Sequence, residues 1–143
     1  MTTNPVYVAI DAPTVDEAKR LTDLVAGAVG GIKLGLEFFM AAGPEGVRAA
    51  RPTGVPLFLD IKLHDIPNTV AGAIRSVVPL SPAFITLHAS GGRAMMQAAA
   101  EAAEKEAEKC GVPRPKLLGV TVLTSLDVAD LEAVGQGMEV AGQ

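Results

Sequence analysis

Five short apolar runs recur along the chain at nearly constant spacing, and this spacing constrains the fold more than any other feature. The runs cover residues 6–10, 31–34, 56–61, 83–87 and 116–123. The strands expected in these runs start near residues 6, 32, 57, 84 and 117. They are therefore spaced by about 26, 25, 27 and 33 residues, which is the length of a unit of one strand and one helix. The runs are rich in Val, Ile, Leu and Phe without strict alternation, which predicts parallel strands buried on both faces. We therefore expect a parallel α/β sheet.

The segments between the runs have helical character. Thr14 is placed as the N-cap of the first helix, and Gly43-Pro44 interrupts the second. Residues 93–109 are rich in Ala, Glu, Lys and Met and end before Gly111, which predicts a long, regular helix. A short helix is expected over residues 126–134.

Chain length and strand number leave two architectures open. The 143 residues are expected to form a single domain over residues 1–143, because a chain of this length closes one core. Five strand–helix units make either a complete doubly wound sheet of five strands or about five of the eight units of a (β/α)₈ barrel. A barrel normally needs about 200 residues or more, so in the second case strands six to eight would be absent.

Charge and composition exclude several classes of protein. The chain has 12 Lys and Arg against 16 Asp and Glu, and only 3% of its residues are aromatic, so we expect no nucleic-acid partner. The single cysteine, Cys110, cannot form an internal disulfide, which fits a reducing compartment. The sequence has no pattern of a signal peptide or of a membrane span. We expect a cytoplasmic protein without a membrane partner.

Polar residues follow the apolar runs at the positions where parallel α/β proteins bind ligands. They are Asp11, Lys33, Asp60, Lys62, His88, Thr124 and Ser125. Asp60 and Lys62 are two residues apart, so they point to the same side of their strand, and Asp65 follows where the chain turns.

A lysine between carboxylates keeps its ammonium form and can act as a positioned general acid. Together with Lys33 from the neighbouring strand, Asp60, Lys62 and Asp65 would form a set of alternating positive and negative charges. A surface salt-bridge cluster is one alternative. A Mg²⁺ site on Asp11, Asp60 and Asp65 is another, although two lysines in the same place would already supply its positive charge.

The segment Asp60-x-Lys62-x-x-Asp65-Ile66-Pro67-Asn68-Thr69 resembles the signature of the orotidine 5′-phosphate decarboxylase family. Residues 8–11, 32–35, 88–92 and 120–125 are similar to the family's first, second, fourth and fifth strand regions, in the same order. The resemblance implies a (β/α)₈ barrel and a homodimer with active sites at the interface. It also implies a lyase of pyrimidine biosynthesis that converts orotidine 5′-phosphate to uridine 5′-phosphate without a cofactor or metal.

The resemblance implies roles for individual residues as well. Lys62 would deliver a proton to C6 of the pyrimidine, and Asp60 would face the departing carboxylate. Asp65 would act from one subunit in the site of the other. The residues implied to bind the substrate are Asp11 and Lys33 at the ribose hydroxyls, Thr124 and Ser125 near the pyrimidine, and Ile66 and Thr69 beside Asp65 in the partner's site.

The family binds the phosphate through a Gln and an Arg of later loops, and these have no counterpart before Gln143. We therefore expect this chain alone to be weak or inactive. The simplest interpretation of Arg93 is that it begins a helix, although it could bind an anion at the helix N-terminus.

Two alternative functions stay open. One is a Mg²⁺-dependent sugar-phosphate lyase of the same superfamily, such as hexulose-phosphate synthase, which has a metal-binding Glu where this chain has Lys33. The other is a non-catalytic half-barrel binding module.

Overall fold

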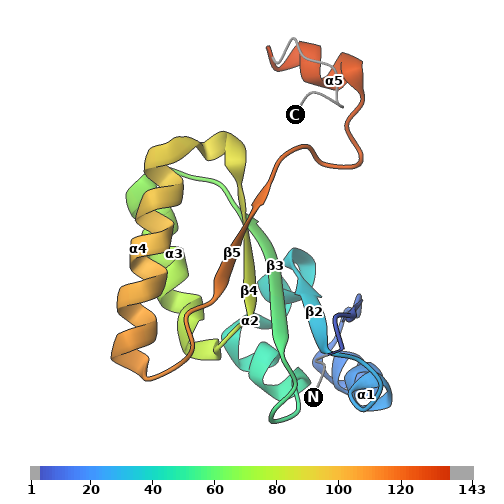
Figure 1. Cartoon of the computed structure of the whole chain (residues 1–143). Coiled ribbons are helices and arrows are strands. Elements are labelled where there is room, and N and C mark those ends of the chain that lie inside the picture. The colour runs from blue at the N-terminus through green and yellow to red at the C-terminus, as the bar shows by residue number, and fades with distance from the viewer. Residues whose placement is uncertain (1–3, 136–143) are drawn as a thin grey trace.

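The computed structural model describes residues 4–135, so residues 1–3 and 136–143 of the expected domain lie outside the described part. Strands and helices alternate along the chain (Figure 1). The strands are β1 (Tyr7–Ala9), β2 (Gly31–Gly35), β3 (Leu57–Leu63), β4 (Phe84–His88) and β5 (Lys116–Val120). The helices are α1 (Val15–Val25), α2 (Leu36–Ala50), α3 (Pro67–Val77), α4 (Gly92–Cys110) and α5 (Val128–Ala133), with 3₁₀ turns η1 (Val78–Leu80) and η2 (Ala89–Gly91) on either side of β4.

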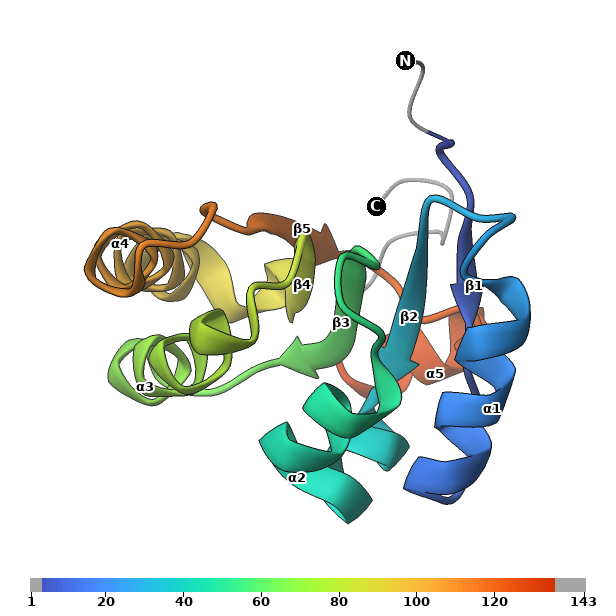
Figure 2. The same cartoon turned by 90° about the horizontal axis from the view of Figure 1, so that it is seen from below.

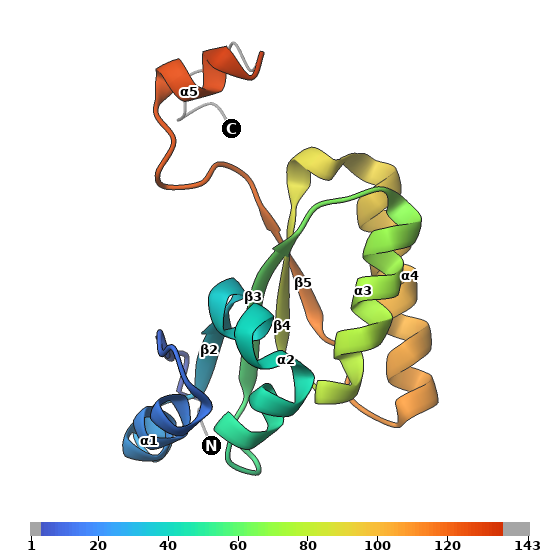
Figure 3. The ribbon, with the colours of Figure 1, turned by 180° about the vertical axis from the view of Figure 1, so that it is seen from behind.

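The strands form one sheet in the order β1-β2-β3-β4-β5, and every neighbouring pair is parallel. This sequential order excludes the doubly wound alternative, in which the strand order reverses within the sheet. It is the order of a (β/α)₈ barrel wall. The sheet is curved, with α1 to α4 on its convex side (Figure 2). Seen from behind, α3 and α4 pack side by side, and α5 lies beyond the carboxyl ends of the strands (Figure 3).

Local sequence signals set the helix ends. Thr14 Oγ1 accepts a hydrogen bond from the backbone N–H of Glu17 at 3.3 Å and begins α1 as predicted. The kink in α2 falls at Gly43, whose φ is 62°, and α4 ends at Gly111, whose φ is 65°. The last helix begins two residues later than predicted because Asp127 caps it. None of the described helices has both the length and the apolarity needed to cross a membrane.

The hydrophobic core lies between the sheet and the helices. Leu57, Leu59 and Ile61 of β3 face this core together with Ile85 and Leu87 of β4, and none of these side chains is more than 5% exposed. Their neighbours in sequence point to the concave face and are mostly half-buried. The prediction of strands buried on both faces is therefore wrong for the concave face, because only the convex face is covered by helices.

Aromatic rings cover the concave face near the amino ends of the strands. The ring of Tyr7 stands edge-on to Phe84 and Phe58, at centroid distances of 5.4 and 6.3 Å. Gly31 lies between them on β2, where a Cβ atom would come within 2.3 Å of the tyrosine ring. This aromatic cluster forms the floor on which the polar residues of the next layer lie.

Candidate functional site

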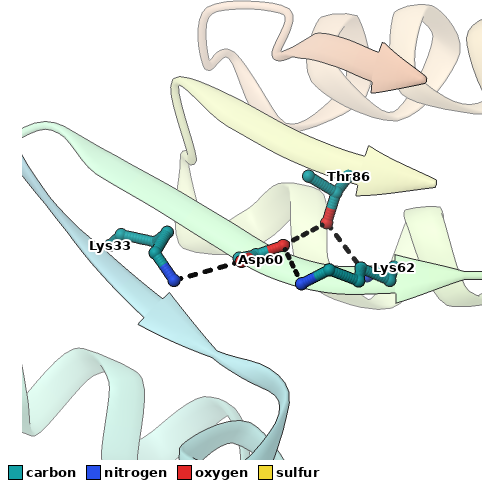
Figure 4. A network of polar contacts seen from close by, with 4 residues as sticks. All are labelled: Lys33, Asp60, Lys62 and Thr86. Carbon is teal, nitrogen blue, oxygen red and sulfur yellow. Dashed lines mark hydrogen bonds and ion pairs between the residues drawn. The ribbon is translucent and has the colours of Figure 1, made fainter. Parts of the chain in front are cut away.

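Three adjacent strands bring two ammonium groups, a carboxylate and a hydroxyl together (Figure 4). Asp60 of β3 is the centre of this network, and its side chain is only 13% exposed. Its Oδ2 accepts a hydrogen bond from Nζ of Lys33 at 3.1 Å. Its Oδ1 accepts one from Nζ of Lys62 and one from Oγ1 of Thr86, both at 2.9 Å. Both oxygens of the carboxylate are therefore held in place.

The alternation of β3 explains why the carboxylate faces this way. Leu57, Leu59 and Ile61 are drawn to the helix side, so Phe58 and Asp60 point to the concave face. Lys33 reaches it from β2, where its neighbours Ile32 and Leu34 are fully buried on the other face. The hydrophobic pattern thus orients the charged residues.

Two opposing effects act on Asp60. Burial raises the pKa of its carboxyl group, but the hydrogen bonds from Lys62, Lys33 and Thr86 outweigh burial, so the pKa lies below its ordinary value. Asp60 is therefore ionised at neutral pH. Two ammonium groups around one carboxylate leave an excess of positive charge, which is suited to an anionic ligand or to negative charge that develops during a reaction.

The backbone is irregular at Lys62. Between Leu59 and Leu63, β3 advances four residues while its partner β4 advances two, from Ile85 to Leu87. Lys62 lies in this bulge with φ of 45°, a left-handed conformation that is uncommon for a residue other than glycine. Such conformations persist only where the surrounding structure holds them, and they concentrate at functional sites.

The expected alternating set of charges is only partly assembled in this chain. Lys33, Asp60 and Lys62 come together, whereas Asp65 is exposed and stays outside the network. The reason is that the chain turns into α3, and Oδ1 of Asp65 accepts a hydrogen bond from the backbone N–H of Ile66 at 2.7 Å. Ile66 is 66% exposed, and Thr69 is exposed as well. This segment is therefore free to contact another molecule.

The other expected substrate-binding residues lie at the same edge of the sheet. Asp11 follows β1, and the backbone N–H of Ile10 donates to the carbonyl of Lys33 at 2.9 Å, so Asp11 enters beside β2. Thr124 and Ser125 form a turn between β5 and α5. All three are exposed, and among residues 4–135 no hydrogen bond joins them to the Asp60 network.

Two imidazoles lie near the network. The rings of His64 and His88 are 5.2 Å apart with 33° between their planes. Burial lowers the pKa of His88, and the positive charges of His64 and Lys62 lower it further. Both imidazoles line a hollow that Leu131 of α5 also lines. Arg93 is exposed in the first turn of α4.

The Mg²⁺ alternative required Asp11, Asp60 and Asp65 to converge. In the described part of the chain no group of three or more His, Cys, Asp and Glu side chains is arranged to hold a metal ion. Asp60 is engaged by lysines, and the other two carboxylates are exposed. Within residues 4–135, these three carboxylates therefore do not fit a metal site.

Thr86 is the member of the network that the sequence analysis missed. It lies within the apolar run 83–87, where a single hydroxyl between Ile85 and Leu87 was the available signal. Only the pairing of β3 with β4 brings that hydroxyl to Asp60.

Comparison with known proteins gives consistent results. The family model described as "Orotidine 5'-phosphate decarboxylase / HUMPS family" matches residues 4–141. Proteins named orotidine 5'-phosphate decarboxylase from Rhodospirillum rubrum and Paramagnetospirillum magneticum are 57% and 56% identical to this chain, and the matches cover 94% and 92% of it. They cover only 55% and 56% of those relatives, so the chain spans about half the length of the curated relatives it matches.

Comparison with solved structures agrees with the sequence comparison. The crystal structure of orotidine 5'-phosphate decarboxylase from Lactobacillus acidophilus matches with a TM-score of 0.78 at 32% identity, over 96% of this chain and 61% of that one. The crystal structure of an uncharacterized conserved protein from Geobacillus kaustophilus also matches with a TM-score of 0.78, at 38% identity, over 90% of this chain and 59% of that one.

Proposed function

The chain belongs to the orotidine 5′-phosphate decarboxylase / HUMPS family, and from this premise we propose that its site decarboxylates orotidine 5′-phosphate to uridine 5′-phosphate. The observation that carries the proposal is the half-buried carboxylate of Asp60, held between the ammonium groups of Lys33 and Lys62 at 3.1 and 2.9 Å. This arrangement supplies fixed positive charge, a proton donor and a negative group on one face of the sheet.

In the proposed reaction, the bond between C6 of the pyrimidine and its carboxylate breaks and carbon dioxide leaves. The electron pair stays on C6, next to the ammonium group of Lys62, which stabilises the developing charge. Lys62 then gives a proton to C6 and is protonated again from water. Asp60 keeps Lys62 in place and faces the departing carboxylate.

We propose that the remaining site residues bind the substrate. Asp11 and Lys33 would contact the ribose hydroxyls, and Thr124 and Ser125 the pyrimidine. The phosphate-binding Gln and Arg that the resemblance implies have no counterpart within residues 1–143. We therefore propose that this stretch of sequence alone turns over slowly, because binding energy from the phosphate would not hold the substrate in position.

We also propose that Asp65, Ile66 and Thr69 complete the site of a second copy in a homodimer. Support comes from their exposure in the single chain, in particular the 66% exposure of the apolar Ile66. A mixing experiment tests this. If Asp65 acts across the interface, the inactive variants Lys62→Ala and Asp65→Ala regain turnover when combined, because one of the two sites of each mixed dimer has both residues. Unchanged inactivity of the mixture, with mixed dimers present, would contradict it.

The activity is tested by following the loss of orotidine 5′-phosphate absorbance with the protein in excess, so that a slow single turnover is measurable. Lys62→Ala should lower the rate by about 10²- to 10⁴-fold, the range of general acid catalysis. Lys19→Ala is the matched control, since Lys19 pairs with Asp23 on the exposed surface of α1. Equal rates for the wild-type chain and Lys62→Ala would refute the assignment. Turnover that requires added Mg²⁺ would favour a sugar-phosphate enzyme of the same family.

A further inference from the structure

Thr86 is a buried polar residue in an otherwise apolar strand. Among residues 4–135, only Thr86 and Thr22 are polar and buried, and Thr86 is 5% exposed. Its Oγ1 donates to Oδ1 of Asp60 at 2.9 Å and accepts from the backbone N–H of Lys62 at 2.9 Å. Burying a hydroxyl group costs free energy unless it is hydrogen-bonded, and these two contacts satisfy the Thr86 hydroxyl.

The direction of both hydrogen bonds is determined by chemistry. An ionised carboxylate can only accept, so the hydroxyl proton of Thr86 must point to Asp60. A backbone N–H can only donate, so a lone pair of the same oxygen must point to Lys62. The hydroxyl therefore has one orientation available.

These contacts close a ring on Lys62. Its Nζ contacts Oδ1 of Asp60, that oxygen contacts Oγ1 of Thr86, and Thr86 contacts the backbone nitrogen of Lys62 (Figure 4). The ring thus ties the ammonium group to its own main chain. It does so where the bulge in β3 breaks the regular ladder and where φ of Lys62 is 45°. The hydroxyl replaces the partner that the ladder does not offer at this point.

We infer that Thr86 is a positioning residue that holds the left-handed backbone of Lys62 and the carboxylate of Asp60 in the arrangement that the reaction uses. This inference rests on the proposed function for its catalytic meaning. Thr86 itself is buried beside Asp60 and acts through the other two residues.

Three substitutions test it. Thr86→Val keeps the shape and removes the hydroxyl, whereas Thr86→Ser keeps the hydroxyl. Thr22→Val is the matched control, because Thr22 is also buried but its hydroxyl donates to the carbonyl of Ala18 within α1. The first readout is hydrogen exchange of the Lys62 amide by NMR, which needs no activity. We expect Thr86→Val to speed this exchange roughly tenfold, while Thr86→Ser and Thr22→Val leave it near the wild-type rate.

A second readout is the NMR titration of the Asp60 carboxyl group. Loss of the Thr86 hydrogen bond should raise the pKa of Asp60, and Thr86→Ser should return it to the wild-type value. If Thr86→Val does not fold, the wild-type chain decides the question, because its Lys62 amide must exchange far more slowly than the amides of the exposed loop after Leu63. An unprotected Lys62 amide, or an amide indifferent to Thr86→Val, overturns the inference.

The activity readout separates this inference from the proposed function. Positioning predicts that Thr86→Val lowers kcat with little change in KM and that Thr86→Ser retains most of kcat. A changed amide exchange with an unchanged kcat would show a purely structural residue and overturn the inference. Absence of turnover in the wild-type chain would count against the proposed function, and the NMR readouts would still decide the role of Thr86.

Discussion

Replacing Asp60 by asparagine isolates the contribution of its negative charge. The amide retains one acceptor oxygen, which we expect to stay toward Lys62 and Thr86, because turning it the other way would lose both contacts. The NH₂ group then faces Lys33 and cannot accept its hydrogen bond. A hydrogen bond to a charged group contributes about 1.5–3 kcal/mol. Because Lys33 is 27% exposed, water replaces part of that contribution, and we expect a loss of about 2 kcal/mol.

Urea unfolding followed by circular dichroism measures this loss. With an m-value of about 1–3 kcal/mol/M, the midpoint of Asp60→Asn should fall by about 1 M at pH 7. Asp23→Asn is the control, since the exposed Lys19–Asp23 pair on α1 should contribute less than about 1 kcal/mol.

The pH dependence provides the refuting test. The pKa of Asp60 is depressed in the folded chain, so its contribution is complete above the unfolded value of about 4 and is lost as the pH falls through the folded value. The difference between wild type and Asp60→Asn should therefore be constant from pH 7 to about 5 and shrink below about 4. Equal midpoints at pH 7, or a difference that persists unchanged to pH 3, would refute the reasoning.

Three further predictions concern stability. Gly31→Ala places a Cβ atom 2.3 Å from the ring of Tyr7, and the overpacking should cost about 1–3 kcal/mol, measured by urea unfolding. Gly111→Ala, at φ of 65°, should cost about 1 kcal/mol in the same assay. Burial and then His64 lower the pKa of His88, so stability should fall as the pH drops below the unfolded value of about 6.5. His88→Gln should weaken this dependence between pH 7.5 and 5.5, and an identical slope in both proteins would contradict the assignment.

The positions of the strands were predictable because burial against the helices leaves a local pattern. Each apolar run corresponds to a strand of the sheet, within a few residues at its ends. The choice between a barrel wall and a doubly wound sheet was not predictable from these patterns. It depends on strand order, which is a property of pairing between distant segments.

The candidate site also has one part that the sequence predicts and one part that it does not. Lys33, Asp60 and Lys62 could be placed together, since adjacent parallel strands present their carboxyl ends at one edge. Thr86 and the left-handed backbone of Lys62 could not, because both follow from the register shift between β3 and β4. The spacing of Asp65 from Lys62 predicts that it joins the network, but the turn into α3 directs it outward.

The aromatic cluster makes this chain its own spectroscopic reporter. Tyr7 is its one tyrosine, and the sequence contains no tryptophan, so the tyrosine emission of the folded protein comes from a single ring. That ring lies 5.4 Å from Phe84 and 6.3 Å from Phe58, beneath the charged residues. Excitation of the phenylalanines passes to a tyrosine at such distances. Loss of this sensitised emission would signal that β1 has left the sheet, without any label or substitution.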